Sequence, residues 1–392
     1  MTNIEIQWVS RAEDIPQRLW EQCFPPPLEG VWWYSTLDRC GIGDQFVFAY
    51  AIIVRSGVRI GIAPTFLMDV PLDIVAPPLV ARIMKTLAAF SPRLMYQRTL
   101  FVGSPCSDEG TVGLADGGDL CDIIPVLQRE LDSRARQLKA SMIVWKDLPD
   151  ETILEAGPIL TDNGLFSLVS YPGTRLGLRG SGFEDYIRML TSHQRYNLRK
   201  KLRQSHKMGR LDESIIQSPD DTLLGEMFSL FLQTYEHGQT KFERLTPAFF
   251  KLISACPVSN FVLLRDSANG KLVAFMLCFL LGKRAINKFI GIDYEYRGNL
   301  FLYFRLWEAA VNWTLGTGAE ELQSGQTGYQ AKYDLGHKFV PLTNYCKHMA
   351  PVVHRIFKTI ARNISWSTLD DDLDTLQNVL RKNPGKVQED KV

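Results

Sequence analysis

The most constraining feature of the chain is the order of patterns between residues 283 and 339. Residues 285–292 (AINKFIGI) favour a strand, and residues 296–299 (YRGN) interrupt it with turn chemistry. Residues 300–315 carry apolar side chains at helical spacing, up to a glycine stop at residues 316–318. A short strand at residues 320–324 and a glycine-framed segment at residues 325–339 follow. A strand that turns into a helix N-terminus presents unpaired N–H groups, so this order predicts an α/β unit with an anion site.

Length and composition point to an ordinary globular protein of two domains. The chain has 392 residues, a net charge of +1 and 45% hydrophobic residues, which gives no overall attraction to nucleic acid or membrane. Its seven cysteines are spaced singly, without a metal-ligand pattern, as in a reducing cytosol. The N-terminus has no secretory signal, and the most apolar stretch, residues 272–281, is too short to cross a bilayer. We therefore expect a soluble, cytoplasmic protein with no transmembrane segment.

The first half of the sequence repeats the order of the second. A predicted hairpin at residues 46–67 precedes a glycine loop at 103–110, a helix at 120–138 and a strand at 141–145. In the second half the hairpin covers residues 260–281. Residues 351–361 are expected to form a last packed helix, before a polar tail from residue 363. Two similar α/β units explain the length better than one large sheet.

A basic run on a predicted helix is the first candidate for binding. Residues 195–210 contain seven cationic side chains and no acid, and Arg195 and Arg199 are the first two of them. Like charges on one helix face repel each other, so the run favours a polyanion such as a phosphate group or RNA. A solvated helix face, neutralised by acids elsewhere in the fold, is an equal alternative.

Two further segments carry candidate chemistry. The turn at Tyr296, Arg297, Gly298 and Asn299 suits a pyrophosphate bound through backbone N–H groups, although an ordinary turn has the same composition. Tyr329 and Lys332 share one side of a predicted helix, where they can hold an anion or protonate a leaving group; a glycine cap with aromatic packing is the alternative.

Another candidate segment lies at the end of a predicted helix. Glu236 or His237 is a candidate general base, and Tyr235 beside them is a candidate for acceptor binding, as is Gln326 in the glycine-framed segment. A polar loop before the next helix has the same appearance.

The second half resembles the GNAT acyltransferase fold, through the YRGN turn (residues 296–299) and the final AKYDLGHKF segment (residues 331–339). More specifically, the chain is similar to the tandem-GNAT group that includes FemAB-like proteins and cellulose-biosynthesis-associated acetyltransferases. Residues 183–203, 245–250 and 325–336 carry this similarity. Lys332 stands where common GNAT enzymes have a tyrosine, which is the FemAB-like pattern. The resemblance implies an α/β fold of two tandem GNAT-like mixed-sheet units.

The resemblance also implies the reaction. We expect an N-acyltransferase that moves an acyl group from acetyl-CoA or another acyl-CoA to an amine of a cell-envelope or polysaccharide precursor. The alternatives are a FemAB-like enzyme that uses aminoacyl-tRNA, and a non-catalytic binding or assembly protein.

The expected catalytic groups are Lys332, Tyr329 and a base at Glu236 or His237, and the mechanism requires no metal. The donor would lie along the 296–299 turn, between strands that part near Gly291 and Gln323. Arg195 and Arg199 would hold phosphate. The expected domains are residues 1–173 and 174–362, followed by a tail at 363–392.

Overall fold

The computed structural model describes residues 4–71, 96–116, 118–238, 243–297 and 301–382. The chain divides into two compact units, each built on its own sheet. The first unit holds residues up to 25, 42–171 and 341–366, and the second holds residues 26–41, 172–340 and those after 366. The boundaries expected at residues 173 and 362 stay predictions. The expected α/β class, with two mixed sheets, is confirmed.

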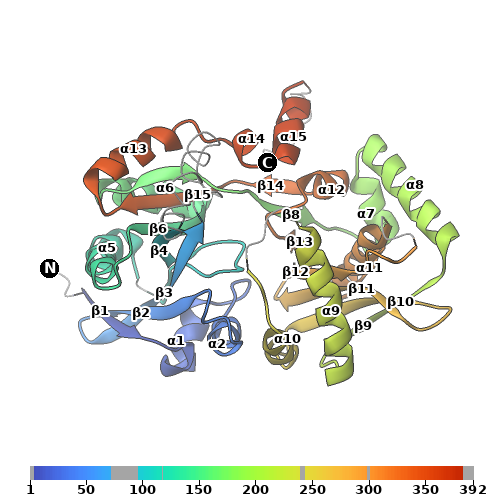
Figure 1. Cartoon of the computed structure of the whole chain (residues 1–392), viewed down its shortest axis with the longest axis horizontal. Coiled ribbons are helices and arrows are strands. Elements are labelled where there is room, and N and C mark those ends of the chain that lie inside the picture. The colour runs from blue at the N-terminus through green and yellow to red at the C-terminus, as the bar shows by residue number, and fades with distance from the viewer. Residues whose placement is uncertain (1–3, 72–95, 117, 239–242, 298–300, 383–392) are drawn as a thin grey trace, which may run out of the picture. The chain divides into compact units, whose positions relative to one another are not determined.

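The first unit is a mixed sheet of the order β1-β2-β3-β4-β6-β15-β7, with β5 paired to β3 (Figure 1). Its strands are β1 (Ile4–Val9), β2 (Val47–Arg55), β3 (Val58–Pro71), β4 (Tyr96–Val102), β5 (Gly113–Leu114), β6 (Met142–Pro149), β7 (Phe166–Val169) and β15 (Leu342–His348). Its helices are α1 (Gln17–Cys23), α5 (Leu120–Gln137), α6 (Asp150–Asp162) and α13 (Pro351–Ala361), with a 3-10 turn at Ala12–Asp14.

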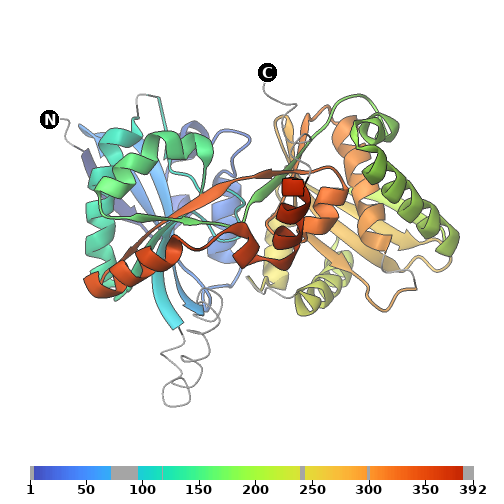
Figure 2. The same cartoon turned by 90° about the horizontal axis from the view of Figure 1, so that it is seen from above.

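Strand β15 comes late in the chain and completes the first sheet. It lies between β6 and β7 and is antiparallel to both, as Figure 2 also shows. The expected helix at residues 351–361 follows it as α13, with the predicted bounds. The buried faces of α5 and α6 close the core with Leu127, Leu131 and Leu160, all of them fully buried.

The second unit is a sheet of the order β14-β8-β13-β12-β11-β10-β9. Its strands are β8 (Gly173–Gly177), β9 (Leu211–Ile216), β10 (Ser259–Asp266), β11 (Leu272–Leu281), β12 (Arg284–Ile292), β13 (Glu321–Ser324) and β14 (Lys338–Val340). Its helices are α2 (Val31–Arg39), α7 (Phe183–Met189), α8 (Ser192–Met208), α9 (Asp221–His237), α10 (Pro247–Ser254), α11 (Leu302–Gly316), α12 (Tyr329–Asp334) and α15 (Asp371–Lys382); α14 (Trp366–Leu369) begins at the last residue of the first unit.

Both faces of the second sheet are covered by helices. On β11, Met276 and Cys278 belong to the apolar cluster that includes Trp307 of α11. The alternate residues face the other way, because side chains alternate along a strand. Thus Phe275 contacts Phe250 of α10, and Phe279 contacts Trp33 of α2. Helix α2 belongs to this unit although it lies early in the sequence.

Among the described residues, no helix combines the length and apolar character that crossing a membrane requires.

Candidate functional site

Strands β12 and β13 are parallel neighbours that pair over only four residues. The register runs from Arg284 opposite Glu321 to Asn287 opposite Ser324, and β12 then continues to Ile292 while β13 ends. The two strands are therefore unpaired beyond Asn287 and Ser324. Gln323 is paired with Ile286, so the separation expected beside Gln323 is wrong, and a slot beyond the last pair stays a prediction.

A β-bulge coincides with the point where the strands part. On the other edge of β12, Asn287 lies opposite Cys278 and Phe289 lies opposite Leu277, so the ladder skips Lys288. A bulge bends its strand and increases the local twist, and bulges are frequent next to active sites.

The last paired residues form a buried polar cluster. Asn287 donates from Nδ2 to Ser324 Oγ over 3.1 Å, and Thr174 of β8 donates from Oγ1 to the Ser324 carbonyl over 2.6 Å. None of the three is more than 6% exposed. Polar groups inside a sheet are costly unless they are hydrogen-bonded, and these are bonded to one another. Sequence analysis did not identify this cluster.

Lys332 lies beside this cluster on α12 and is 5% exposed. Its Nζ donates to the carbonyl oxygen of Gly325, the first residue after β13. A buried ammonium is costly in a dry interior, and this one lies within a residue of the place where the strands part. The structure thus brings the predicted Lys332 to the strand divergence.

Several contacts hold α12 in place. Gly328 has φ 66°, a left-handed conformation suited to glycine, and begins the helix. Tyr329 is fully buried, and its hydroxyl donates to the Pro172 carbonyl over 3.0 Å. Tyr186 of α7 donates to the Leu335 carbonyl over 2.8 Å. Tyr329 therefore anchors the helix through its hydroxyl. Gln326 lies half-buried in the loop before it.

His337 is a member of this neighbourhood that sequence analysis missed. Its side chain is buried beside Lys332, and its ring centroid lies 4.7 Å from that of Trp307. Neither ring nitrogen has a hydrogen-bond partner among the described residues. Burial, and next the positive charge of Lys332, hold the pKa of His337 well below its usual 6.5. The imidazole is therefore neutral beside the ammonium.

The C-terminal end of α9 is fastened to the outer end of β12. Thr234 accepts from the backbone N–H of Ile292 over 3.0 Å, and the His237 ring stacks on Tyr294 with centroids 3.9 Å apart. Glu236 and His237 are exposed there, and Tyr235 is half-buried. The candidate bases therefore lie at the end of β12 where the predicted donor turn begins.

The described part of that turn borders a hollow of about 710 Å³. Tyr296 and Arg297 line it, together with Arg210 and the carboxylates of Asp212 and Asp266. Burial, and then the charge of Asp266, raise the pKa of Tyr296. Gly298 and Asn299 lie outside the described residues. Two guanidinium groups and two carboxylates thus line the hollow, beside the C-terminal end of α8 at Met208.

Arg195 and Arg199 lie in a separate hollow between α7 and α8, of about 620 Å³. Arg199 pairs with Glu184 over 2.6 Å, and the exposed ring of Tyr196 lies beside them. An acid from α7 thus neutralises part of the basic run, while Arg195 and Arg203 also line the hollow. The two predicted arginines are together, but the structure does not place them with Lys332.

Lys288, at the bulge, carries a buried ion pair that sequence analysis also missed. Its side chain is 2% exposed, and its ammonium lies 2.9 Å from the Glu29 carboxylate and 5.1 Å from the Trp33 ring centroid. Glu29 lies 259 positions earlier in the sequence, next to α2. No local sequence signal indicates such a pairing.

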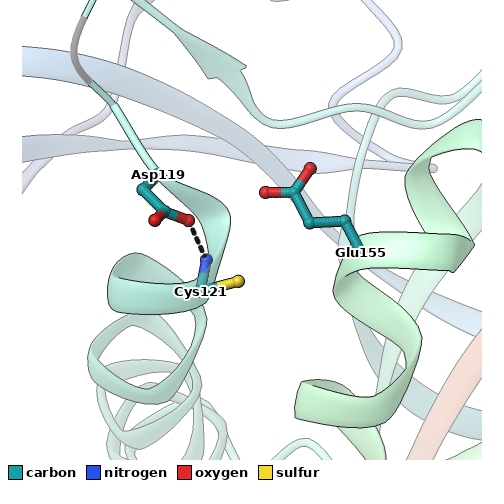
Figure 3. A group of neighbouring side chains, drawn as sticks. All are labelled: Asp119, Cys121 and Glu155. Atoms are coloured by element: carbon teal, nitrogen blue, oxygen red, sulfur yellow. Dashed lines mark hydrogen bonds between the residues drawn. The ribbon is translucent and has the colours of Figure 1, made fainter.

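The first unit contains a surface group of Asp119, Cys121 and Glu155, whose ligand-type atoms lie within 4.8 Å of one another. Figure 3 shows Glu155 of α6 directed toward the first turn of α5, where the Asp119 carboxylate accepts from the Cys121 N–H over 2.7 Å. Desolvation, and then the hydrogen bond and charge of Asp119, raise the pKa of the Cys121 thiol. We interpret the group as an N-terminal helix cap.

The comparisons with known proteins agree with this geometry. Residues 192–329 match the family model of the acetyltransferase (GNAT) domain. The structure is similar to that of FemX, with a TM-score of 0.58 and 11% identity over 90% of this chain and 100% of the other. It is also similar to a tandem GNAT protein from the clavulanic acid biosynthesis pathway, with a TM-score of 0.50 and 12% identity over 89% and 99% of the two chains. No curated protein matches by sequence.

Residues 192–329, in the second unit, thus form an acetyltransferase (GNAT) domain, and the chain has the fold of a tandem GNAT protein. The expected fold and enzyme class are confirmed.

Proposed function

We propose that the chain transfers an acyl group from acyl-CoA to an amine of a cell-envelope or polysaccharide precursor, and that the donor's tail lies between β12 and β13. The observation that carries the proposal is the parting of these strands after Asn287 and Ser324, with the buried ammonium of Lys332 at the same point. A slot between strands leaves backbone groups without ladder partners, and an extended tail can bond to them.

The donor's phosphates would lie at the other end of β12. Tyr296 and Arg297 border the hollow there, and in the sequence Gly298 and Asn299 continue the same turn toward the start of α11 at Leu302. The N–H groups of the first turn of a helix and its dipole favour phosphate. This placement would let one extended molecule run from the α11 N-terminus to Lys332.

The proposed reaction is direct transfer. The amine nitrogen attacks the thioester carbonyl carbon, the carbonyl oxygen becomes an oxyanion, the C–S bond breaks and the thiolate takes up a proton. The ammonium of Lys332 would stabilise the oxyanion or supply that proton, since a charge acts strongly in a dry site. Tyr329 would orient α12. Gln326 would contact the acceptor. Glu236, His237 and Tyr235 lie at the other end of β12, beside the donor's phosphates, so the amine proton would pass to water rather than to Glu236 or His237.

A second donor is favoured by one specific observation. Arg195, Arg199 and Arg203 line one hollow beside the exposed Tyr196, which is a setting that suits an RNA backbone and a stacked base. Aminoacyl-tRNA would present an ester carbonyl to the same chemistry. The similarity to FemX concerns the fold and does not decide between these donors.

Calorimetry would separate the candidates. Acetyl-CoA, desulfo-CoA and charged tRNA are titrated into the full chain, and thiol release is followed with a panel of amines. Binding of acetyl-CoA with amine-dependent thiol release supports the first proposal. Salt-sensitive binding of charged tRNA alone supports the second. If neither donor binds, both donor proposals fail and a non-catalytic binding protein is favoured.

A further inference from the structure

The outward face of α13 in the first unit presents apolar side chains to solvent. Val352 is 70% exposed and Ile356 is 51% exposed, and they lie four residues apart on the same side of the helix. They are among the most exposed large apolar side chains of the described residues. Adjacent exposed apolar residues on a helix call for an explanation that a single one does not.

The opposite face of α13 already has its partners. Phe357 and Ala361 pack on a cluster of Met142, Val144, Phe166 and Cys346, and the Phe357 ring lies 5.5 Å from that of His348. The helix is therefore held to the sheet by residues at positions 357 and 361. Val352 and Ile356 are not part of that cluster.

The exposed surface of α13 and its C-terminal end also carries cations, besides the neutral Pro351, Thr359 and Asn363. Arg355, Lys358 and Arg362 are all exposed, and no acid occurs in the sequence from residue 348 to 369. The helix thus combines two exposed apolar side chains with three cations over eleven positions. This combination is typical of helices that lie in the surface plane of a bilayer.

We propose that α13 docks the protein on a membrane surface that contains anionic lipids. Val352 and Ile356 would enter the region between headgroups and acyl chains, while Arg355, Lys358 and Arg362 would contact lipid phosphates and keep their charges at the interface. The apolar and the cationic groups are each weak anchors, and stable attachment needs both.

Other occupants fit this surface less well. A stable protein interface needs about 20–30 residues a side, many more than this patch offers. In a symmetric dimer through α13 the three cations would face their own copies, which is unfavourable. A nucleic acid backbone would pair with the cations but would leave Val352 and Ile356 without a purpose. The proposal is independent of the acyl donor and acceptor.

Vesicle co-sedimentation of the full chain tests the proposal. Vesicles of phosphatidylcholine alone are compared with vesicles that also contain phosphatidylglycerol, at low and high salt. We expect binding to the anionic vesicles only, weakened by salt. Replacing all three cations by glutamine should lower the partition coefficient about a hundredfold, since each cation near an anionic surface contributes about a fivefold increase.

A second variant tests the contribution of the two apolar side chains to vesicle binding. The double variant Val352→Glu and Ile356→Glu should abolish sedimentation. The matched control is Val58→Glu with Leu154→Glu, which alters side chains that are 63% and 84% exposed elsewhere in the same unit, and it should bind as the wild type does. Circular dichroism verifies that all variants fold. Equal binding by the two double variants would overturn the proposal. So would a wild-type dimer in light scattering that Ile356→Glu dissociates.

Discussion

Asn287 on β12 and Ser324 on β13 are joined by a side-chain hydrogen bond of 3.1 Å across the last pair of residues that the two strands share. Beyond it the strands part, on the side where the buried Lys332 contacts the Gly325 carbonyl. This bond marks the closed end of the proposed donor slot. The proposed acyl transfer requires that the donor's tail binds between β12 and β13 beyond this hydrogen bond.

Lys332→Met removes the charge and keeps the length of the side chain. We expect kcat to fall about 10²- to 10³-fold, the magnitude typical of losing one group that stabilises an oxyanion, while the dissociation constant of the donor stays unchanged. The thermal midpoint should not fall, because burying a charge is costly. Thiol release measures kcat, titration calorimetry measures the dissociation constant of the donor, and thermal unfolding measures the midpoint. Lys251→Met, at an exposed position of α10, is the control, and an unchanged kcat in Lys332→Met would remove Lys332 from the mechanism.

Arg297→Ala tests the phosphate end of the slot. Loss of one charged hydrogen-bonding group should weaken binding of acetyl-CoA by about 1.5–3 kcal/mol, and the loss should shrink at high salt. Arg188→Ala on α7 removes an arginine that is 71% exposed and should leave the affinity unchanged. If the two variants bind the donor equally well, the phosphate lies elsewhere.

Gly291→Ala should destabilise the second unit. A Cβ at this position would lie 2.7 Å from the Phe231 nitrogen and 2.8 Å from the Leu230 carbonyl carbon, both of them backbone atoms of α9. We expect the free energy of unfolding to fall by about 1–3 kcal/mol, the range for overpacking a core. Urea denaturation measures it.

Gly225→Ala, in the helix α9 that Gly291 faces, should have the opposite effect on the free energy of unfolding. A Cβ at Gly225 would meet nothing within 4 Å, so alanine should raise the stability by about 0.5–1 kcal/mol. A Gly291→Ala variant as stable as the wild type would show that α9 is not packed against β12 at this point.

His337 should make stability depend on pH. Its pKa is lowered in the folded state, so the unfolded state binds more protons once the pH falls below about 6.5, and the free energy of unfolding then decreases. His337→Leu should reduce this slope by up to about 1.4 kcal/mol per pH unit below that value. Urea denaturation between pH 7.5 and acid pH, in about one-unit steps, compares the two proteins. Equal slopes would show that the imidazole is hydrated or charged in the folded protein.

Local patterns predicted much of the fold. The expected strand at residues 285–292, helix at 300–315 and strand at 320–324 correspond to β12, α11 and β13 within two residues at each described boundary. Periodicity and glycine stops are local signals, which is why they succeeded. The return of β15 to the first sheet and the placement of α2 in the second unit depend on long-range packing, which leaves no such signal.

The candidate site was predicted only in part, because local signals mark some of its residues and long-range packing determines the others. Lys332 was predicted because a family pattern marks it, whereas Thr174 and Ser324 are bonded across 150 positions of sequence. Burial decides the importance of such polar residues, and a single sequence does not reveal the burial of a serine or an asparagine. The sequence places His337 in a glycine-framed segment and gives no sign that its ring is buried beside Trp307.

The most direct test of the central claim is amide hydrogen exchange with and without a non-hydrolysable acyl-CoA analogue. The account predicts slower exchange in residues 288–292 of β12 and in residues 325–328 after β13, because the donor's tail would bond to and cover these two segments. Exchange that stays unchanged in both segments while the analogue is bound would contradict it.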